Sequence, residues 1–291
     1  MNHPNTTRRI ERRLGDRVRA RLPGWFGEFV MFVLKQGWAA LFGGVMLGAI
    51  IVTSAIWQDG WALRRYDFLF LFALSNQAIF LALRLETWAE ARVILLFHLT
   101  GTAMEVFKIA AGSWAYPEAG LFKLAGVPLF SGFMYAAVGS YMARVIRIFE
   151  MRFAPYPPFW ATLLLAIAIY VNFFAHHFVP DIRLALFAVT ILMFARTRIW
   201  FFIGDTARWM PLPLAAFLSS IALWVAENVG TLTGTWVYAG QDQFQLVSIA
   251  KMGSWYLLLF VAFVTVTLVV RGPLSRARLT ASALSAARTL P

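Results

Sequence analysis

Two glutamates within apolar segments are the strongest candidates for chemistry in this sequence. Glu105 and Glu227 each lie near one end of a long hydrophobic stretch, where an ionised carboxylate is costly unless it is paired or hydrated. Two such carboxylates facing inward can act as an acid–base pair, so we predict both as catalytic. The alternative is that Glu105 pairs with Lys108, one helical turn away, while Glu227 bonds to hydroxyls, and both only brace a helix bundle. Asn228, next to Glu227, joins Lys108 among the predicted substrate-binding residues.

The segment after each glutamate repeats. Six residues separate Glu105 from Gly-Ser-Trp-Ala-Tyr, and six separate Glu227 from Gly-Thr-Trp-Val-Tyr. We predict that the glycine ends each helix and that the aromatic residues line a pocket, where their faces can stabilise a cation. The alternative is a belt of interfacial aromatic residues that anchors the chain in lipid. The predicted pocket residues are Trp114, Tyr116, Trp236 and Tyr238.

A second polar cluster lies between two later apolar segments. It consists of Asn172, His176, His177, Asp181 and Arg183. Adjacent histidines on a helix point about 100° apart and rarely share one metal, so we expect no metal site. We predict His177 as catalytic, and His176, Asp181 and Arg183 as contacts for a polar head group or as part of a proton path. Metal binding and a purely structural interfacial cluster stay open as alternatives.

The composition indicates that lipid is the solvent for most of the chain. Hydrophobic residues make up 60% of the 291 positions, charged residues 14%, and the mean hydropathy is +0.68. A soluble domain carries roughly 25% charged residues. The net charge of +12 is spread between the apolar segments and at the termini, which argues against nucleic acid as a partner. The absence of cysteine excludes disulfides and thiolate catalysis.

Hydropathy predicts about eight transmembrane helices, each near the ~20 residues that a bilayer requires. With the N-terminus inside, 20 of the 26 Lys and Arg residues fall on the inner side. This is the bias expected of cytoplasmic segments, so we predict a multi-pass protein of a bacterial inner membrane with both termini cytoplasmic. The predicted spans are 38–57, 66–85, 90–112, 127–149, 158–179, 181–203, 211–234 and 248–270.

We therefore predict an all-α membrane protein. Its parts are a basic cytoplasmic arm (1–37), two four-helix membrane units (38–151 and 152–271) and a disordered cytoplasmic tail (272–291). The arm is either a helix along the head groups or a disordered basic tail. The repeated glutamate motif spans four helices, so the two units point the same way and predict a pocket between two parallel repeats.

The chain contains three distinctive long strings: EVFKIAAGSWAYPEAGLFKLAGVPLFSGFMYAAVGSY, YVNFFAHHFVPDIR and WVAENVGTLTGTWVY. They resemble the YoaT-like family of uncharacterised bacterial inner-membrane proteins. This resemblance implies a membrane location and no activity.

A weaker likeness links the chain to heterodimer-type lycopene cyclases and acyclic carotenoid hydratases. It implies protonation of an isoprenoid double bond by a carboxylic acid in an aromatic pocket. This chain has Phe130-Ser131-Gly132 where the cyclases carry paired glutamates after the proline, which argues against cyclisation itself. The matching positions are Glu105, Gly112, Trp114, Tyr116, Gly126, Val127 and Pro128.

From these observations we expect an intramembrane enzyme that acts on an isoprenoid or lipid at the outer leaflet. A transporter or ion-coupled carrier with its site between the repeats is the alternative, and a structural membrane subunit without chemistry is a third reading. The expected partners are membrane lipids and a hydrophobic small molecule. The sequence identifies no cofactor and no oligomeric state.

Overall fold

The computed structural model describes residues 24–58, 60–175, 178–204, 207–240 and 245–282, and the single residues 15, 22 and 284. Most of them are helical. The helices are α2 (Gly24–Ala39), α3 (Leu41–Ile56), α4 (Arg65–Ala82), α5 (Trp88–Ala110), α6 (Phe130–Ile148), α7 (Phe159–Ala175), α8 (Arg183–Phe194), α9 (Leu212–Leu232) and α10 (Ile249–Val269). The short strands are β1 (Trp114–Ala115), β2 (Lys123–Leu124), β3 (Val127–Pro128), β4 (Arg152–Ala154), β5 (Arg198–Phe202), β6 (Ala207–Pro211) and β7 (Val237–Tyr238).

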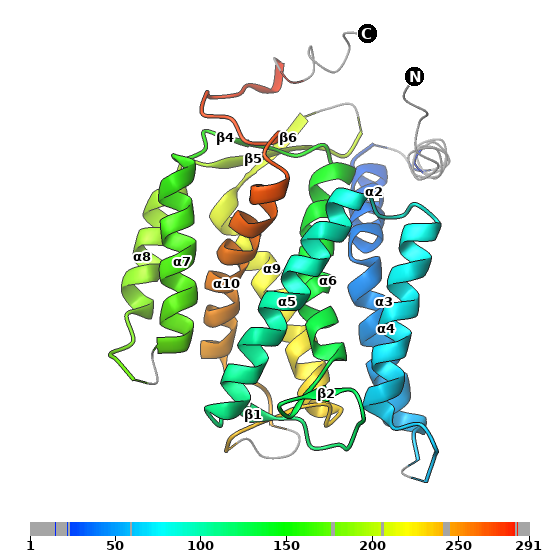
Figure 1. Cartoon of the computed structure of the whole chain (residues 1–291). Coiled ribbons are helices and arrows are strands. Elements are labelled where there is room, and N and C mark those ends of the chain that lie inside the picture. The colour runs from blue at the N-terminus through cyan, green and yellow to red at the C-terminus, as the bar shows by residue number, and fades with distance from the viewer. Residues whose placement is uncertain are drawn as a thin grey trace.

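The helices form one bundle, with the connections between them at its two ends (Figure 1). In its middle, α5 packs on α6 and α9 packs on α10, while α6 also contacts α10. Helices α3 and α4 lie on one side of this group, and α7 and α8 lie on the other. Helix α2 begins and α10 ends at the upper end of Figure 1, whereas β1 and β2 lie at the lower end.

Several helices are long and apolar enough to cross a bilayer. Among the described residues, α5, α9 and α10 meet this test individually, and α2 with α3 adds a fourth span if this pair, bent by 70°, counts as one. Helices α7 and α8 are shorter apolar helices. Large apolar side chains such as Leu99, Leu164 and Leu192 lie on the outer surface and are 58–76% exposed. Contact of so many apolar side chains with water would be unfavourable. These features indicate a membrane protein.

Helix α5, which carries Glu105, begins at a capping box. The Glu90 N–H donates to Thr87 Oγ1 (3.2 Å), and the Thr87 N–H donates to Glu90 Oε2 (2.6 Å). The other oxygen of Glu90 pairs with Arg147 Nε on α6 at 2.8 Å. Because one carboxylate both caps α5 and binds α6, the two helices are fixed against each other at the upper end.

The predicted span 181–203 is wrong in its second half. Helix α8 ends at Phe194, and residues 198–202 form β5, the middle strand of an antiparallel sheet ordered β4-β5-β6. Polar residues interrupt the apolar run here, and Thr197 Oγ1 donates to the Pro155 carbonyl at 2.9 Å. The aromatic sequence that follows favours extended backbone. The fold is thus mostly helical, with short strands, where we had expected helices alone.

The two ends of the chain differ from their expected boundaries. Helix α2 begins at Gly24, inside the predicted arm 1–37; of residues 1–23, only 15 and 22 are described. Residues 272–282 make ordered contacts, in contrast to the disordered tail expected over 272–291. The Phe153 N–H donates to the Pro273 carbonyl (2.9 Å), and the Ser275 N–H donates to the Phe153 carbonyl (3.0 Å), so this segment follows β4.

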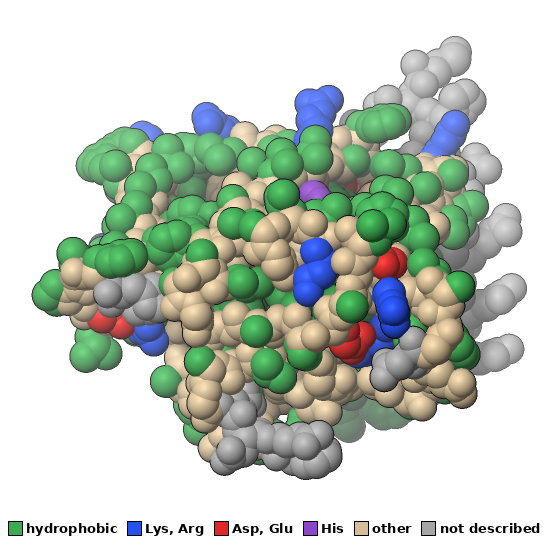
Figure 2. Space-filling model, turned by 60° about the horizontal axis from the view of Figure 1, so that its bottom comes forward, with side chains coloured by type: hydrophobic (Ala, Val, Ile, Leu, Met, Phe, Trp, Pro, Cys, Tyr) green, Lys and Arg blue, Asp and Glu red, His purple; other side chains and the backbone are tan. Residues whose placement is uncertain are grey.

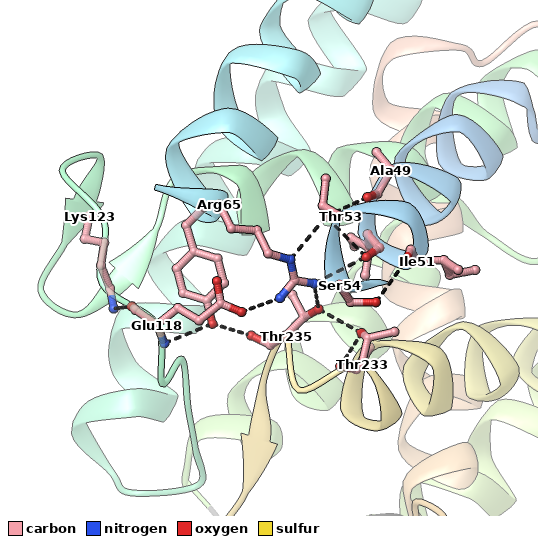
Figure 3. Close-up of polar contacts among 12 residues, drawn as sticks. Ala49, Ile51, Thr53, Ser54, Arg65, Glu118, Lys123, Thr233 and Thr235 are labelled. Carbon is pink, nitrogen blue, oxygen red and sulfur yellow. Dashed lines mark hydrogen bonds and ion pairs between the residues drawn. The ribbon is translucent and has the colours of Figure 1, made fainter. Parts of the chain in front are cut away.

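A buried arginine joins the lower connections (Figure 3). Arg65, 5% exposed, donates from Nε to Thr53 Oγ1 (3.1 Å) and from Nη2 to Thr235 Oγ1 (2.8 Å), and it forms an ion pair with Glu118. A guanidinium presents five donors in a fixed plane, so it can bind partners from three segments at once. Arg65 thereby ties the end of α3 to the segments that follow α5 and α9.

Asp67, in the first turn of α4, binds the segment between α5 and α6. Its two carboxylate oxygens accept hydrogen bonds from the Leu121 and Phe122 N–H groups, each at 2.9 Å. Asp67 is 4% exposed, so these contacts are shielded from water. Helix α4 therefore holds the segment between α5 and α6 in place.

We expect Asp67→Ala to lower the free energy of unfolding by about 1–3 kcal/mol, since two backbone donors lose a buried partner. The matched control is Glu28→Ala, which removes a pair with Arg208 whose side chains are 40% and 49% exposed. Such exposed pairs contribute about 0–1 kcal/mol. Thermal melting in detergent measures both variants. Equal melting temperatures for the two would contradict the role given to Asp67.

Candidate functional site

Helices α5 and α9, which carry the two glutamates, end in the same way. Gly112 and Gly234 follow them with φ of +68° and +64°, the left-handed conformation that glycine adopts without strain. The next N–H groups return to the last turns: Ser113 donates to the Lys108 carbonyl and Thr235 to the Gly230 carbonyl, each at 2.9 Å. These bonds form a Schellman cap at both helices. The prediction that the glycine ends each helix is confirmed.

The caps turn each following tryptophan back onto its own helix. Trp114 Nε1 donates to Glu105 Oε2 at 2.7 Å, and Trp236 Nε1 donates to Glu227 Oε1 at 2.8 Å. Both glutamates are buried, at 3% and 8% exposure. Indole N–H groups only donate, so each gives its carboxylate a fixed partner in an apolar setting.

A tyrosine provides a second donor to each carboxylate. The Tyr135 hydroxyl, from α6, donates to Glu105 Oε1 at 2.6 Å, and the Tyr238 hydroxyl donates to Glu227 Oε1 at 2.5 Å. Glu105 therefore receives one of these donors on each oxygen. Trp236 and Tyr238 both reach Oε1 of Glu227. Tyr116 is a further hydrogen-bond partner of Glu105, and Trp255 is a further partner of Glu227. The two glutamates occupy similar surroundings but are bound differently.

The two aromatic segments pair with each other as strands. Trp114 of β1 lies opposite Tyr238 of β7, their ring centroids 5.7 Å apart. Tyr116 packs against Trp236 with centroids 6.4 Å apart. Burial raises the pKa of Tyr116 and of Tyr238, and the next cause is the charge of Glu105 for Tyr116 and of Glu227 for Tyr238. Both hydroxyls therefore stay protonated and can donate.

A cavity of about 820 Å³ lies between the helices, and both glutamates line it. Its size falls within the roughly 300–1,000 Å³ of small-molecule sites. Trp114, Tyr116, Trp236 and Tyr238 all line it, as expected of pocket residues. The rest of its wall is mostly apolar or small, with Gly43, Gly44, Leu47, Met134, Val138, Ala222, Leu223, Ala226, Leu258 and Leu259 among its members.

Three cationic side chains line the lower part of the same cavity: Lys108 of α5, Arg183 of α8 and Lys251 of α10. Lys251 Nζ lies 3.3 Å from the centroid of the Tyr238 ring, and Lys108 Nζ lies 4.1 Å from that of Phe173. Figure 2, in which the lower end comes forward, shows Lys and Arg side chains near Asp and Glu side chains on a face that is otherwise mostly hydrophobic or neutral.

The structure separates the α7–α8 cluster into parts with different roles. Arg183 lines the cavity, whereas Asp181 is not among the lining residues and instead pairs with Arg183 at 3.1 Å. Asn172 braces the connection by accepting from the Ile182 N–H at 3.1 Å. His176 and His177 lie outside the described residues. Within the described part of the chain, no three His, Cys, Asp or Glu residues converge as metal ligands.

Asn228 has a structural position, although we predicted it as a substrate contact. Its Nδ2 donates to the Trp224 carbonyl at 2.7 Å, and its Oδ1 accepts from the Val247 N–H at 2.8 Å. Asn228 is not among the residues that line the cavity. It holds the segment before α10 against α9.

Sequence reasoning did not assign Tyr135, Trp255 or Lys251 to the site, although all three line the cavity. Ser131, Tyr135 and Val138 follow the i, i+4, i+7 spacing of one helix face, which could have indicated a shared lining. Lys251 is the one charged residue of α10. No signal in the sequence singles out Trp255.

Gly230 provides the space that Trp236 needs to reach Glu227. A Cβ at this position would lie 1.9 Å from Cη2 of Trp236. We expect Gly230→Ala to cost about 1–3 kcal/mol of stability, as overpacking does, measured by melting in detergent. Gly48→Ala is the control, because nothing lies within 4 Å of its Cβ position, and it should be neutral or slightly stabilising.

A Trp236→Ala background separates this clash from other effects of the methyl group. With the indole removed, Gly230→Ala should cost little, so the two substitutions should be strongly non-additive. An equal cost in both backgrounds would show that the methyl group clashes elsewhere.

Comparison with known proteins identifies the family of this chain. The family model described as "Protein of unknown function (DUF817)" matches residues 28–263, from α2 to α10. The "Uncharacterized protein YoaT" of Bacillus subtilis (strain 168) is 40% identical over 240 residues, which cover 82% of this chain and 90% of that protein. No solved structure matches the chain significantly. The chain belongs to the DUF817 family.

Proposed function

We propose that the protein is an intramembrane enzyme that performs acid–base chemistry on an isoprenoid or lipid, with Glu105 and Glu227 as the acid and base. One observation carries this proposal: two buried carboxylates, each held by a tryptophan and a tyrosine, line a single cavity whose wall is otherwise largely apolar. An apolar cavity with a few convergent polar groups is the usual form of a ligand site. A bundle-bracing role alone gives no reason for the cavity.

The chemistry requires one glutamate to be protonated and the other ionised. The protonated carboxyl would donate its proton to a carbon of a substrate double bond, leaving a cation on the neighbouring carbon. The faces of Trp114, Trp236 and Tyr238 would stabilise that cation. The second carboxylate would then take a proton from an adjacent carbon, or from a water molecule that adds to the cation, so the reaction needs no oxidant or reductant.

We further propose that α3 to α10 are eight transmembrane helices of a bacterial inner membrane, with both termini cytoplasmic and the cavity nearer the outer leaflet. Their positions along the chain support this topology, because each overlaps one apolar segment of the sequence. Helix α8, with 12 residues, is shorter than a full bilayer crossing, and the buried strand β5 continues from it. The excess of Lys and Arg on the proposed inner side supports the orientation.

The pairing of β1 with β7 supports two parallel repeats. Ala115 lies opposite Val237, and these are equivalent positions of the repeated motif, as are Trp114 and Trp236. A two-fold axis along the membrane normal would pass between them. Helix packing agrees, since α5 on α6, α3 on α6 and α3 on α4 have the counterparts α9 on α10, α7 on α10 and α7 on α8. Helix α6 also contacts α10, its counterpart in the other proposed repeat.

A carrier is the second candidate, and one feature of the cavity favours it. The lining extends to Gln36, Tyr141 and Ser219, which lie far from the glutamates along α2, α6 and α9. The Tyr141 hydroxyl donates to Gln36 Oε1 at 2.8 Å, so polar groups are present toward the other end of the cavity. Opening at that end would connect the site to the cytoplasm.

Replacement of the two glutamates tests the enzyme proposal. We expect Glu105→Gln and Glu227→Gln each to slow the reaction by about 10²–10⁴-fold, the usual contribution of a general acid or base. Membranes of a strain carrying the double variant should accumulate the unconverted isoprenoid or lipid, detected by mass spectrometry of organic extracts. Glu150→Gln, an exposed glutamate beyond the upper end of α6, is the control and should change nothing.

A second measurement separates the enzyme from the carrier. If the double variant leaves every lipid and pigment unchanged, the enzyme proposal is wrong. Ion or solute flux into liposomes that contain the wild-type protein, lost in the double variant, would then identify a carrier.

A further inference from the structure

We propose that the ligand of the cavity is an amphiphile with a phosphate head group, held by Lys108, Arg183 and Lys251, whose hydrocarbon chain extends between α3, α6, α9 and α10. This inference names the substrate class and rests on the proposed function only for the claim that the ligand is then converted. It combines a cationic end and an apolar interior within one cavity.

Lys251 carries the argument for an anionic ligand. Its side chain is partly buried, and its ammonium lies over the Tyr238 ring. Glu227 interacts electrostatically with Lys251, but among the residues that the structure describes no carboxylate oxygen lies within ion-pair distance of Lys251 Nζ. A partly buried charge without a direct ion pair is costly, so an anion at this point of the cavity would stabilise the folded protein.

The other two cations surround the same region from different helices. Lys108 comes from the last turn of α5, Arg183 from the first residue of α8, and Lys251 from the first turn of α10. Each lines the cavity, and the two lysines and Arg183 are close enough to repel one another. Asp181 compensates Arg183 in part, through a contact of 3.1 Å outside the lining.

The number and directions of these cations favour phosphate over carboxylate. A phosphate monoester carries about −1.5 to −2 charges and three acceptor oxygens, so it can contact donors that converge from three sides. Arginine adds a forked donor pair suited to such oxygens, and each lysine adds a point charge. A carboxylate, with one charge and two oxygens in a plane, would leave part of this arrangement uncompensated.

The rest of the cavity fits a single hydrocarbon chain. Gly43, Leu47, Val138, Leu223 and Leu258 belong to its wall, and they offer no charge. The head group would lie beside Tyr238, whose hydroxyl donates to Glu227 at 2.5 Å. The first carbons of the chain would consequently lie next to the glutamates, where the proposed proton transfers take place.

Binding of farnesyl phosphate and farnesol, two probes that differ only in the head group, tests this inference. The full chain in phosphatidylcholine nanodiscs should retain farnesyl phosphate in native mass spectrometry and bind farnesol at least about tenfold more weakly. Lys251→Gln should weaken farnesyl phosphate binding by about tenfold and leave farnesol binding unchanged. Lys251→Arg should retain farnesyl phosphate binding. If Lys251→Gln does not fold, Arg183→Gln should show the same loss of farnesyl phosphate binding.

Lys123→Gln is the matched control. Lys123 lies at the same end, but it donates to the carbonyls of Tyr116 and Glu118 and does not line the cavity. Its replacement should leave farnesyl phosphate binding unchanged. Equal binding of both probes by the wild-type protein, or an equal loss in the Lys123 and Lys251 variants, would overturn the inference.

Two further arms separate this inference from its neighbours. Inorganic phosphate should displace farnesyl phosphate only at far higher concentration; displacement at equal concentration would identify free phosphate as the ligand and overturn the inference. The Glu105→Gln, Glu227→Gln double variant should still bind farnesyl phosphate, because it keeps all three cations. Unchanged binding with lost conversion supports both proposals, whereas conversion of a neutral lipid without phosphate binding would overturn only this one.

Discussion

The structure depends on the cost of placing two carboxylates inside an apolar bundle. Each requires donors that do not carry charge, and in both cases the chain supplies one of them, a tryptophan, from the segment directly after the same helix. This solution imposes further requirements. Each helix must end before a left-handed residue so that the chain reverses, and in α9 the returning indole lies where only Gly230 leaves room for it. The network around Arg65 then fixes the returned segments.

The opposite end of the bundle is held by a different set of polar contacts. Glu86, whose pKa is raised by burial, accepts from Ser140 at 2.5 Å and from Gln77 at 2.7 Å. Arg144, fully buried, donates to the Trp38 carbonyl at 2.6 Å and lies over the rings of Trp38 and Phe80. Polar networks therefore secure both ends of the bundle, and between them the small and apolar residues that line the cavity leave it open.

Local features were predictable from the sequence, and long-range ones were not. The glycine caps and the proximity of each Trp to its glutamate follow from spacing within about ten residues. The contact of Tyr135 with Glu105 depends on how α6 packs on α5, including the room at Gly101, where a Cβ would lie 2.6 Å from Tyr135. Periodicity gives the faces of a helix but does not say which neighbour each face meets.

The missed strand and the ordered tail have a related cause. Hydropathy cannot distinguish a buried strand from the end of an apolar helix, so it predicts helix over the residues of β5. The segment 272–282 is polar and rich in small residues, yet it forms backbone hydrogen bonds with β4. Such bonds need only a free backbone edge on a partner, and composition carries no information about that edge.

The unequal hydrogen bonding of the two glutamates gives the site a direction. Trp114 and Tyr135 donate to different oxygens of Glu105, whereas Trp236 and Tyr238 both donate to Oε1 of Glu227. Trp255 also bonds to Glu227, and Lys251 lies over the Tyr238 ring. A molecule that entered this cavity would meet different groups at its two ends, and turning it end over end would not give an equivalent complex. Under the proposed chemistry, the groups around the two glutamates would therefore select by orientation which carbons of the molecule react.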